Sequence, residues 1–345
     1  MSKTHSRLRK VVSWLFVGIL VSGIGAGSYL GYKAYAAASK VANTSNPLAL
    51  VASFTRSDLK STNNITNILI AGNSSDDIGH SGAALTDSIM IASINHTTKK
   101  VTLVSVPRDL WVNIPGYGYS KINAAYAYGG MALLETVAET NLGIHCNYNL
   151  LVDYMALKQS VDAVGGIDVT IASSDSRGLY DPSEDYTTGG ALVNLTNGVH
   201  HLTGQQALNL ARARGDNYGS YGYAQSDFTR TQYQQQILLA LGKKAQSASA
   251  IANPFAAGKI IASLGSNIST NLTLGQMETV YNDYRSVSVT IATITLNDIN
   301  GQNLLANYTS SNGQSALIPS AGFDDFSVIQ STLKTLFEQT ITSEG

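Results

Sequence analysis

The sequence predicts a layered α/β domain that is built around a mixed central sheet. Apolar, β-rich runs at 65–72, 88–95 and 101–107 are typical of strands, and helical patterns follow them along the chain. The short polar segment HTTKK joins the last two runs, so they are expected to form an antiparallel hairpin. Strands that are separated by helices pair in parallel, which makes the sheet mixed. No internal repeat or clear linker divides residues 63–340, which we expect to form one domain.

The other elements are predicted from periodicity and from residues that start or stop helices. Thr203 and Gln206 have the spacing of a capping box, and Gly143 and Gly165 follow helical patterns that they are expected to end. Residues 172–191 are rich in Ser, Asp, Gly and Tyr and are expected to be irregular. Helices are expected at 122–143, 154–166, 203–211, 226–246, 273–285 and 324–339, and further strands at 167–171 and 287–296.

The N-terminus predicts a membrane anchor. Residues 1–10 hold four Lys or Arg and no acid, and 11–33 begin with 22 uncharged residues, whereas a spanning helix needs about 20. Because positive flanks stay in the cytoplasm, we expect a cytoplasmic tail (1–10), a single-pass anchor (11–33), a linker (34–62) and an extracytoplasmic domain at the cell membrane. A cleaved signal peptide is the alternative, since AYAAAS offers small residues to a peptidase. The uncharged run exceeds the roughly 7–15 apolar residues of a signal peptide, which favours the anchor.

Composition restricts the class of function. The 345 residues carry a net charge of −1, and 13% of them are charged, so no basic character points to nucleic acid. An exported domain of this charge is also a poor candidate for a DNA-reading regulator. Cys146 is the single cysteine, so the chain has no internal disulfide and its core must hold the fold without one. We expect Cys146 to be a buried small apolar residue.

The predicted hairpin brings a carboxylate and a guanidinium together. If its turn is centred between Thr97 and Thr98, Asp87 lies opposite Arg108 at one end of the two strands. Ordinary surface ion pairs contribute little, and such a pair is the simplest interpretation. However, SVPRDLW places a proline and Asp109 directly beside Arg108 at a strand end, which is where open α/β sheets bind ligands.

Three arginines lie close together further along the chain. Arg212, Arg214 and Arg230 fall within nineteen positions, although the chain beyond residue 33 has seven arginines in all. Residues two apart on a helix point about 200° apart, so we expect the helix to end near Ala211 and an extended R-x-R segment to follow. Arg230 and Gln234 share one face of the next helix. Because guanidinium groups bind phosphate oxygens in pairs, the sequence predicts a ligand with two or more phosphates; scattered structural salt bridges are the alternative.

The motifs and their order resemble the LytR–CpsA–Psr family of bacterial envelope proteins. The resemblance covers about residues 66–245 and continues more weakly to about 340. A predicted membrane helix also precedes the motifs, as it does in the family. The matching motifs are NILIAG, TDSIMIASIN, SVPRDLWVNIPG, KINAAYAYGG, DAVGGIDV, HLTGQQALNLARAR and DFTRTQYQQQIL.

The resemblance implies a layered α-β-α fold and a phosphotransferase on the outer face of the membrane. Such proteins move a glycopolymer, for example teichoic acid or capsule, from a polyprenyl-pyrophosphate carrier to peptidoglycan. The polyprenyl chain is expected in an apolar cavity between sheet and helices, and Mg²⁺ bridges the pyrophosphate. The pyrophosphate-binding residues carried over from the family motifs are Arg108, Arg212, Arg214, Arg230 and Gln234.

The predicted metal site departs from the family pattern. The family's metal aspartate in R-[ST]-D falls on Asp87, but its second aspartate, after the first strand, falls on Asn73, Ser74 or Ser75. Asp76 and Asp77 follow directly. Magnesium is typically held by one or two carboxylates together with phosphate oxygens, so Asp87 with Asp76 or Asp77 is expected to suffice.

Two further positions lack a family arginine. Leu85 stands two residues before the metal aspartate, and Tyr233 stands beside Gln234. These departures keep a second hypothesis open, namely a protein that binds the lipid-linked glycopolymer without turning it over. In the first hypothesis, Asp109 is the candidate base that accepts the proton of the attacking sugar hydroxyl; a carboxylate that is merely paired with Arg108 is the alternative.

Overall fold

The computed structural model of the chain describes residues 57–73, 85–182, 193–224, 226–245, 268–273, 276, 279–280, 291–296, 299 and 301–338. The predicted tail, anchor and most of the linker lie outside these residues, as do Asp76 and Asp77 and most of the helix expected at 273–285. Within the described part of the chain, no helix combines the length and the apolar character that crossing a membrane requires.

The central sheet is mixed, as predicted. Its strands lie in the order β11-β6-β1-β2-β3-β12. The β1–β2, β2–β3 and β11–β6 pairs are antiparallel, whereas β1–β6 and β3–β12 are parallel. The strands are β1 (Ile65–Asn73), β2 (Thr86–Asn95), β3 (Lys100–Val106), β6 (Tyr148–Asp153), β11 (Ile268–Thr270) and β12 (Ile291–Thr295).

The predicted register of the β2–β3 hairpin is confirmed. Asn95 pairs with Lys100 and Ile89 pairs with Val106, which places the turn between Thr97 and Thr98. The backbone N–H groups of both threonines donate to Asn95 Oδ1 at 3.0 Å, so this side chain fixes the turn locally.

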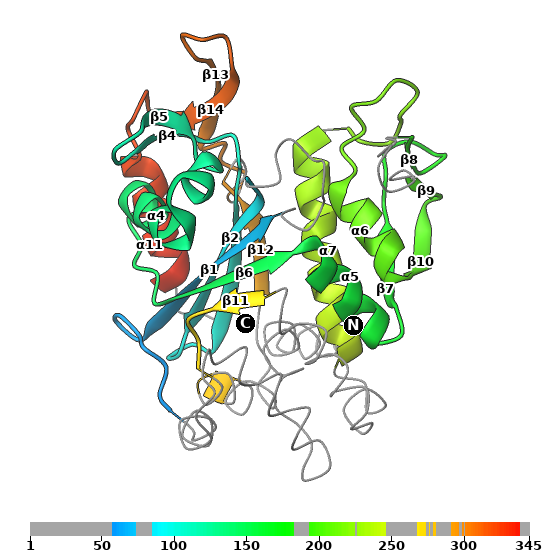
Figure 1. The fold of residues 1–345 in the computed structure, drawn as a ribbon, viewed down its shortest axis with the longest axis horizontal. Helices are drawn as coiled ribbons and strands as arrows, with labels where there is room; N and C mark the ends of the chain where they lie inside the picture. Colours follow the sequence, from blue (N-terminus) through cyan, green and yellow to red (C-terminus); the bar gives the residue numbers. More distant parts are fainter. Residues whose placement is uncertain are drawn as a thin grey trace, which may run out of the picture.

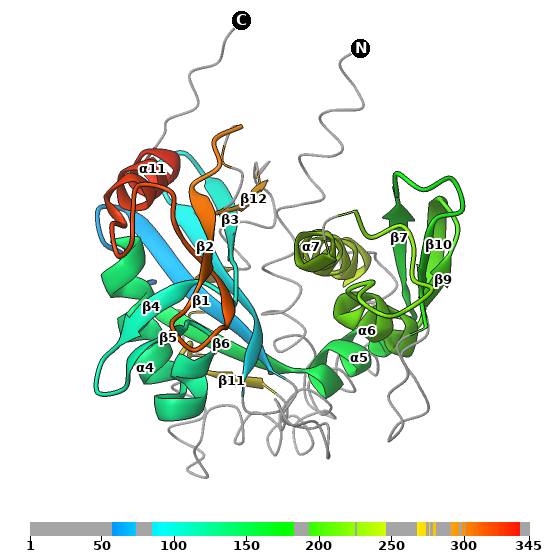
Figure 2. The same cartoon turned by 90° about the horizontal axis from the view of Figure 1, so that it is seen from above.

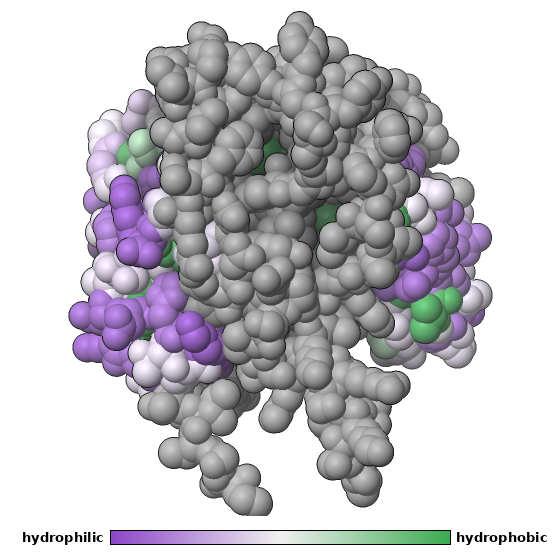
Figure 3. Space-filling view, turned by 90° about the horizontal axis from the view of Figure 1, so that it is seen from below, coloured by the Kyte–Doolittle hydropathy of each residue, from purple (hydrophilic) through white to green (hydrophobic). Residues whose placement is uncertain are grey.

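Helices cover both faces of the sheet (Figures 1 and 2). One layer consists of α4 (Ala124–Leu142) and α11 (Ser327–Glu338), which pack with alternate side chains of β1 and β2 in the largest apolar core. The other layer consists of α5 (Tyr154–Ala163), α6 (Gly204–Arg212) and α7 (Ser226–Ala245). Seen from below, the described side chains on the flanks are mostly hydrophilic, with small apolar areas (Figure 3).

The strand predicted at 167–171 does not join the central sheet, although it forms where expected. It is β7 (Ile167–Ile171), which pairs antiparallel with β10 (Gly198–Leu202) in a separate two-stranded sheet. This small sheet packs against α6 and α7 in a second apolar core. In Figure 2 it therefore forms an outer layer beyond these helices.

One predicted helix start is confirmed, and one predicted helix differs from expectation in detail. The α6 capping box at Thr203 and Gln206 is confirmed. The α4 helix ends at Gly143, whose φ of 66° is left-handed, but it is interrupted at Gly129 and Gly130. The φ of 64° at Gly130 is non-helical, so the first turns of α4 are kinked away from the rest.

Three hairpins were not predicted. Their strands are only three to five residues long, too short to give a clear periodic run in the sequence. They are β4 (Trp111–Ile114) with β5 (Gly118–Lys121), β8 (Leu179–Asp181) with β9 (Val193–Leu195), and β13 (Leu305–Thr309) with β14 (Ser315–Pro319).

Candidate active site

The Asp87–Arg108 pair forms as the hairpin register predicts. Asp87 is the second residue of β2, and Arg108 follows the end of β3. Arg108 Nη1 donates to Asp87 Oδ1. Both side chains are largely buried, at 18% and 13% exposed, so this ion pair is shielded more than a surface pair is.

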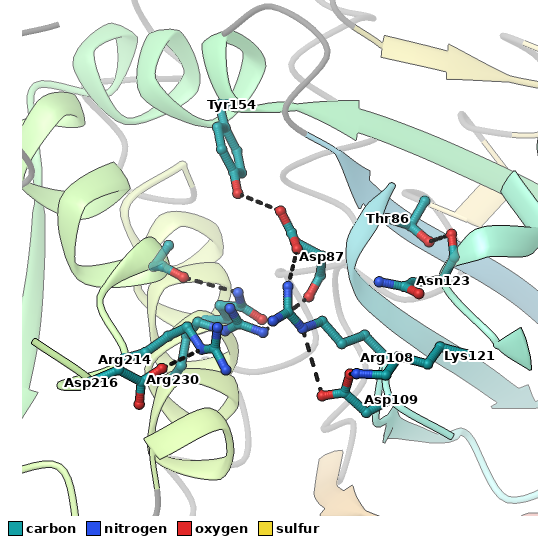
Figure 4. A network of polar contacts seen from close by, with 12 residues as sticks. Thr86, Asp87, Arg108, Asp109, Lys121, Asn123, Tyr154, Arg214, Asp216 and Arg230 are labelled. Atoms are coloured by element: carbon teal, nitrogen blue, oxygen red, sulfur yellow. Dashed lines mark hydrogen bonds and ion pairs between the residues drawn. The ribbon is translucent and has the colours of Figure 1, made fainter. Parts of the chain in front are cut away.

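Tyr154, the first residue of α5, is a second hydrogen-bond donor to the Asp87 carboxylate. Its hydroxyl donates to Asp87 Oδ2 at 3.1 Å (Figure 4). Burial raises the pKa of Tyr154, and the nearby Asp87 charge raises it further, although Arg212 and Arg230 oppose the shift. The hydroxyl therefore remains a protonated donor at neutral pH. The Arg212 guanidinium carbon lies 5.0 Å from the centroid of the same ring, within the range of a cation–π contact.

The R-x-R segment leaves the helix as predicted, one residue later than expected. Helix α6 ends at Arg212, and Ala213 is extended, with φ −63° and ψ 132°. Arg212 and Arg214 therefore flank an extended residue and can serve the same side. Arg214 Nε lies 3.2 Å from Asp216 Oδ2.

Arg230 and Gln234 connect α7 to the site. Arg230 is 4% exposed, and its Nη2 donates to the backbone carbonyl of Asp87 at 3.4 Å. Gln234 Nε2 donates to the carbonyl of Ala211 at 2.9 Å, near the end of α6. Arg108 and Arg230 therefore reach Asp87 from two separate segments, and Figure 4 also shows Arg214 with its partner Asp216 on the helix side of the site.

Asp109 lies between two cations. Lys121 Nζ lies 2.6 Å from Asp109 Oδ1, and Arg108 Nε lies 3.8 Å from Asp109 Oδ2. The predicted pairing with Arg108 is thus present, but Lys121 is the closer partner. Sequence reasoning missed Lys121 because the β4–β5 hairpin that carries it was not predicted; the available signal was its place in the KINAAYAYGG motif.

Asp181, on β8, holds the segment that follows the R-x-R arginines. It is 1% exposed, and its Oδ2 accepts from the backbone N–H groups of Arg214 at 3.0 Å and Gly215 at 2.8 Å. Its Oδ1 accepts from Asn217 Nδ2 at 3.1 Å and from Ser220 Oγ at 3.4 Å. One buried carboxylate therefore fixes the backbone from which Arg214 projects.

An apolar cavity of about 100 Å³ lies between the sheet and the helices α5 and α7. Ser88, Met90 and Gln234 line both this cavity and a smaller hollow that is bordered by Asp87 and Arg108, so the cavity adjoins the charged residues. The apolar side chains that line it include Ile70, Met90, Leu150, Val152, Leu157, Ile237, Leu238 and Leu241.

The described residues fit a magnesium site in part. No group of three or more His, Cys, Asp or Glu side chains suited to a metal occurs among them. Asp87 is the predicted ligand within this part of the chain, and its two oxygens accept from Arg108 and Tyr154. A single carboxylate suffices for Mg²⁺ where phosphate oxygens supply other ligands, but the ion must then displace one of these donors.

Two positions that bear on the departures from the family pattern, Asn73 and Leu85, lie among the described residues. Asn73 ends β1, is 1% exposed, and is opposite Thr86 and Asp153 on the neighbouring strands. Leu85, just before β2, packs against the largest apolar core. The chain therefore has an apolar contact where the family pattern has an arginine.

Fold and site define an α/β protein in which arginines from separate segments surround a carboxylate beside an apolar cavity. The chain belongs to the LytR_cpsA_psr family, whose model matches residues 28–318. The resemblance to this family and the expected fold are thus confirmed.

Several relatives agree with this assignment. The chain is 32% identical over 308 residues to the polyisoprenyl-teichoic acid–peptidoglycan teichoic acid transferase TagU of Oceanobacillus iheyensis, covering 85% of this chain and 87% of that protein. It is 34% identical over 170 residues to the regulatory protein MsrR of Staphylococcus aureus, covering 49% of this chain and 46% of that protein. The crystal structure of TagV from B. subtilis matches with a TM-score of 0.59 at 26% identity, covering 81% of this chain and 100% of that one.

Proposed function

We propose that this protein is a membrane-anchored phosphotransferase on the outer face of the cell membrane. It moves a glycopolymer from a polyprenyl-pyrophosphate carrier to peptidoglycan. The observation that supports this most is that Arg108 and Arg230 both contact Asp87, with Arg212 over the Tyr154 ring beside it, next to an apolar cavity. A ligand with a charged head and a greasy tail fits this combination of surfaces, and the TagU relative is named for such a carrier and such a transfer.

The arginines neutralise the pyrophosphate in this proposal. Phosphoryl transfer depends mainly on positioning and on charge neutralisation, which guanidinium groups supply through paired hydrogen bonds. Arg230 is buried and tied to the Asp87 backbone, and Gln234 is held against α6, so both are positioned before the ligand binds. The lipid tail occupies the cavity between the sheet and α7.

The reaction exchanges the phosphoanhydride bond of the carrier for a phosphodiester bond to the acceptor. A peptidoglycan hydroxyl attacks the phosphorus that carries the glycopolymer, the bond to the lipid phosphate breaks, and polyprenyl phosphate leaves. Asp109 accepts the proton of the attacking hydroxyl, and Lys121 at 2.6 Å keeps this carboxylate oriented. Asp87, with Asp76 or Asp77, would hold Mg²⁺, which would further neutralise the phosphate charge.

The first test compares Arg108→Ala with Arg177→Ala, using a polyprenyl-pyrophosphate-linked glycan and Mg²⁺. Loss of a donor that stabilises developing charge costs about 10²–10³-fold in rate, so Arg108→Ala should lower phosphate-bond cleavage by this order. Arg177 pairs with Asp175 on the exposed surface, and its variant should cleave at the normal rate. If Arg108→Ala retains full activity, the proposed site is wrong.

The same assay separates the enzyme from a binding protein. Asn73, Ser74 or Ser75 stands where the family pattern has a metal ligand, and Leu85 stands where it has an arginine. These departures motivate the second candidate, a protein that holds lipid-linked glycopolymer without turnover. Tight binding of the carrier analogue without cleavage, with or without Mg²⁺, would support that candidate. Cleavage that stops on chelation of Mg²⁺, with an unchanged melting temperature, supports the enzyme.

A further inference from the structure

A group of exposed aromatic rings lies beyond the charged residues and has no part in the proposed chemistry. We call it the aromatic surface, and it consists of Tyr117, Tyr119, Tyr128, Tyr308 and Phe323. Four of these rings are unusually exposed for large apolar side chains: Tyr117 57%, Tyr119 41%, Tyr128 45% and Phe323 49%. The rings form two clusters, Tyr117 with Tyr128 and Tyr119 with Phe323 and Tyr308, and the β4–β5 hairpin supplies a ring to each. Large exposed apolar side chains gathered in this way mark interaction sites.

The rings are held in place by one another. Tyr117 and Tyr128 stack with centroids 4.4 Å apart and planes 8° apart, and the Tyr117 hydroxyl donates to the Tyr128 carbonyl at 3.3 Å. Phe323 lies 5.1 Å from Tyr119 and 5.6 Å from Tyr308. Because these contacts already fix the side chains, a ligand that binds here orders few additional rotamers.

Glycines in the backbone make this exposure possible. Gly116 and Gly118, with φ of 84° and 77°, form the tight turn that carries Tyr117 out between β4 and β5. The interruption of α4 at Gly129 and Gly130 comes directly after Tyr128. The helix therefore turns away at the point where the Tyr128 ring meets Tyr117.

The surface has the chemistry of a sugar-binding platform. Pyranose rings present flat C–H faces that pack on aromatic rings, and hydroxyls that bond to the phenol groups at the rim. The rim also carries a carboxylate, because the Tyr119 hydroxyl donates to Asp324 Oδ2 at 2.7 Å. A phosphate-rich polymer is repelled by this carboxylate and attracted to the arginines, so a neutral sugar backbone is the better match.

The segments that carry the aromatic surface are bonded to the segment that carries Arg108 and Asp109. Ile122 N–H donates to Leu110 O at 2.8 Å, and Leu317 N–H donates to Asp109 O at 3.0 Å. These bonds join β14 and the residue after β5 to the segment that carries the proposed base. In Figure 1 the two hairpins lie together at the end of the sheet.

The two sides of the sheet then receive different ligands. The cavity opens between the sheet and α7, whereas the aromatic surface belongs to the layer of α4 on the other face (Figure 2). In phosphoryl transfer the attacking and leaving oxygens are roughly in line. If the lipid phosphate leaves on the cavity side, the attacking hydroxyl approaches from the side of the aromatic surface.

We propose that the aromatic surface binds the glycan strand of the acceptor and presents its hydroxyl to the proposed base. This inference rests on the proposed function and assigns the acceptor-binding site of the same reaction. The ligand assigned here is the acceptor glycan, because the proposed function already assigns the donor's phosphates to the arginines and its lipid tail to the cavity.

The test uses the full chain in a mild detergent and a soluble, uncharged, phosphate-free glycan of alternating N-acetylglucosamine and N-acetylmuramic acid whose lactyl carboxyl groups are amidated. The double variant Tyr117→Ala/Phe323→Ala removes one ring from each cluster, Tyr117→Phe keeps the ring, and Val328→Ala is the control, since Val328 is similarly exposed at 43% on α11. Because the double variant removes two aromatic contacts, it should weaken glycan binding on the order of tenfold. Tyr117→Phe and Val328→Ala should bind within about twofold of the unaltered chain.

Kinetics and a separate donor arm complete the test. In the double variant, the KM for the acceptor should rise while kcat at saturating acceptor and the Kd for a polyprenyl-pyrophosphate analogue stay unchanged. Three results would overturn the inference: unchanged glycan binding, weakened donor binding, or a change confined to self-association measured by sedimentation. If neither the unaltered chain nor the double variant binds glycan, but both cleave the carrier, the inference is wrong and the proposed function stands. If the unaltered chain does not bind the carrier at all, the proposed function itself is wrong.

Discussion

Tyr154 links a carboxylate and an arginine of the site through one side chain. Its hydroxyl lies 3.1 Å from Asp87, and its ring lies 5.0 Å from the Arg212 guanidinium carbon. We expect Tyr154→Phe to lower carrier cleavage at least tenfold, because a hydrogen bond to a charged group contributes about 1.5–3 kcal/mol and the ring alone remains. Since burial raises the pKa of this hydroxyl, the pH profile between pH 6 and 9 should keep its shape.

Initial rates across that pH range check this expectation. Tyr180→Phe is a suitable control, because Tyr180 stacks on Tyr221 and lies outside the described contacts of Asp87. Equal cleavage rates for Tyr154→Phe and the unaltered chain would show that the Tyr154 hydroxyl is not needed to position Asp87.

Cys146 illustrates a residue whose chemistry is suppressed by its surroundings. Burial raises the pKa of its thiol, and Glu139 and Glu135 add to the shift. Because the thiolate is the reactive form, native protein at pH 8 should resist iodoacetamide, and unfolded protein should react fully. Mass spectrometry after timed labelling measures the difference. Rapid labelling of the native chain would mean that the segment around Cys146 opens locally.

The conformation of the segment that follows α6, residues 214–220, depends on the side chain of Asp181. Asp181 accepts four hydrogen bonds from residues 214–220. Asp181→Ala should destabilise the fold by about 1–3 kcal/mol, because buried donors lose their acceptor, and should slow cleavage through a displaced Arg214. The more exposed Asp175→Ala is the control, and hydrogen exchange at Gly215 is the readout. Unchanged exchange at Gly215 would exclude this role for Asp181.

Elements that depend on neighbouring residues could be predicted from the sequence. The β2–β3 register follows from a turn that Asn95 closes, and the α6 start follows from Thr203 and Gln206, so both were read correctly. Interruptions were missed, because Gly129 and Gly130 fall inside an otherwise helical pattern. The roles of Tyr154 and Lys121 could not be predicted either, since each depends on packing between segments that are distant along the chain.

At the scale of the whole molecule, the sheet and α7 enclose the space assigned to the lipid tail. Leu157 on α5 lines this space, and Leu157→Trp should fill part of the cavity of about 100 Å³. We expect weaker binding of long polyprenyl pyrophosphates, by about tenfold, and unchanged binding of inorganic pyrophosphate, because the arginines stay in place. Met155→Trp, on the exposed side of the same helix, is the control. Calorimetric titration measures both ligands, and parallel losses would place the tail elsewhere.

The sequence predicted the layers but not how strands are shared between sheets. The alternation of strands and helices indicated helices on both faces of a mixed sheet, and this holds. Pairing partners are set by long-range packing, so the separate β7–β10 sheet was not foreseen. The Asp87–Arg108 contact could be predicted because both residues lie on one hairpin, and a cavity was expected from the family resemblance rather than from any local pattern.

The parallel pairing of β3 with β12 has a consequence for how the chain matures. It joins residues 101–105 to residues 291–295, and β14 then bonds to the backbone of Asp109. Contacts so distant in sequence form slowly, because a long loop must close before they are gained. During synthesis, the arginines of the site are therefore present in the chain before β12 exists to pair with β3. The edge of β3 stays unpaired until nearly all of the polypeptide has been synthesised.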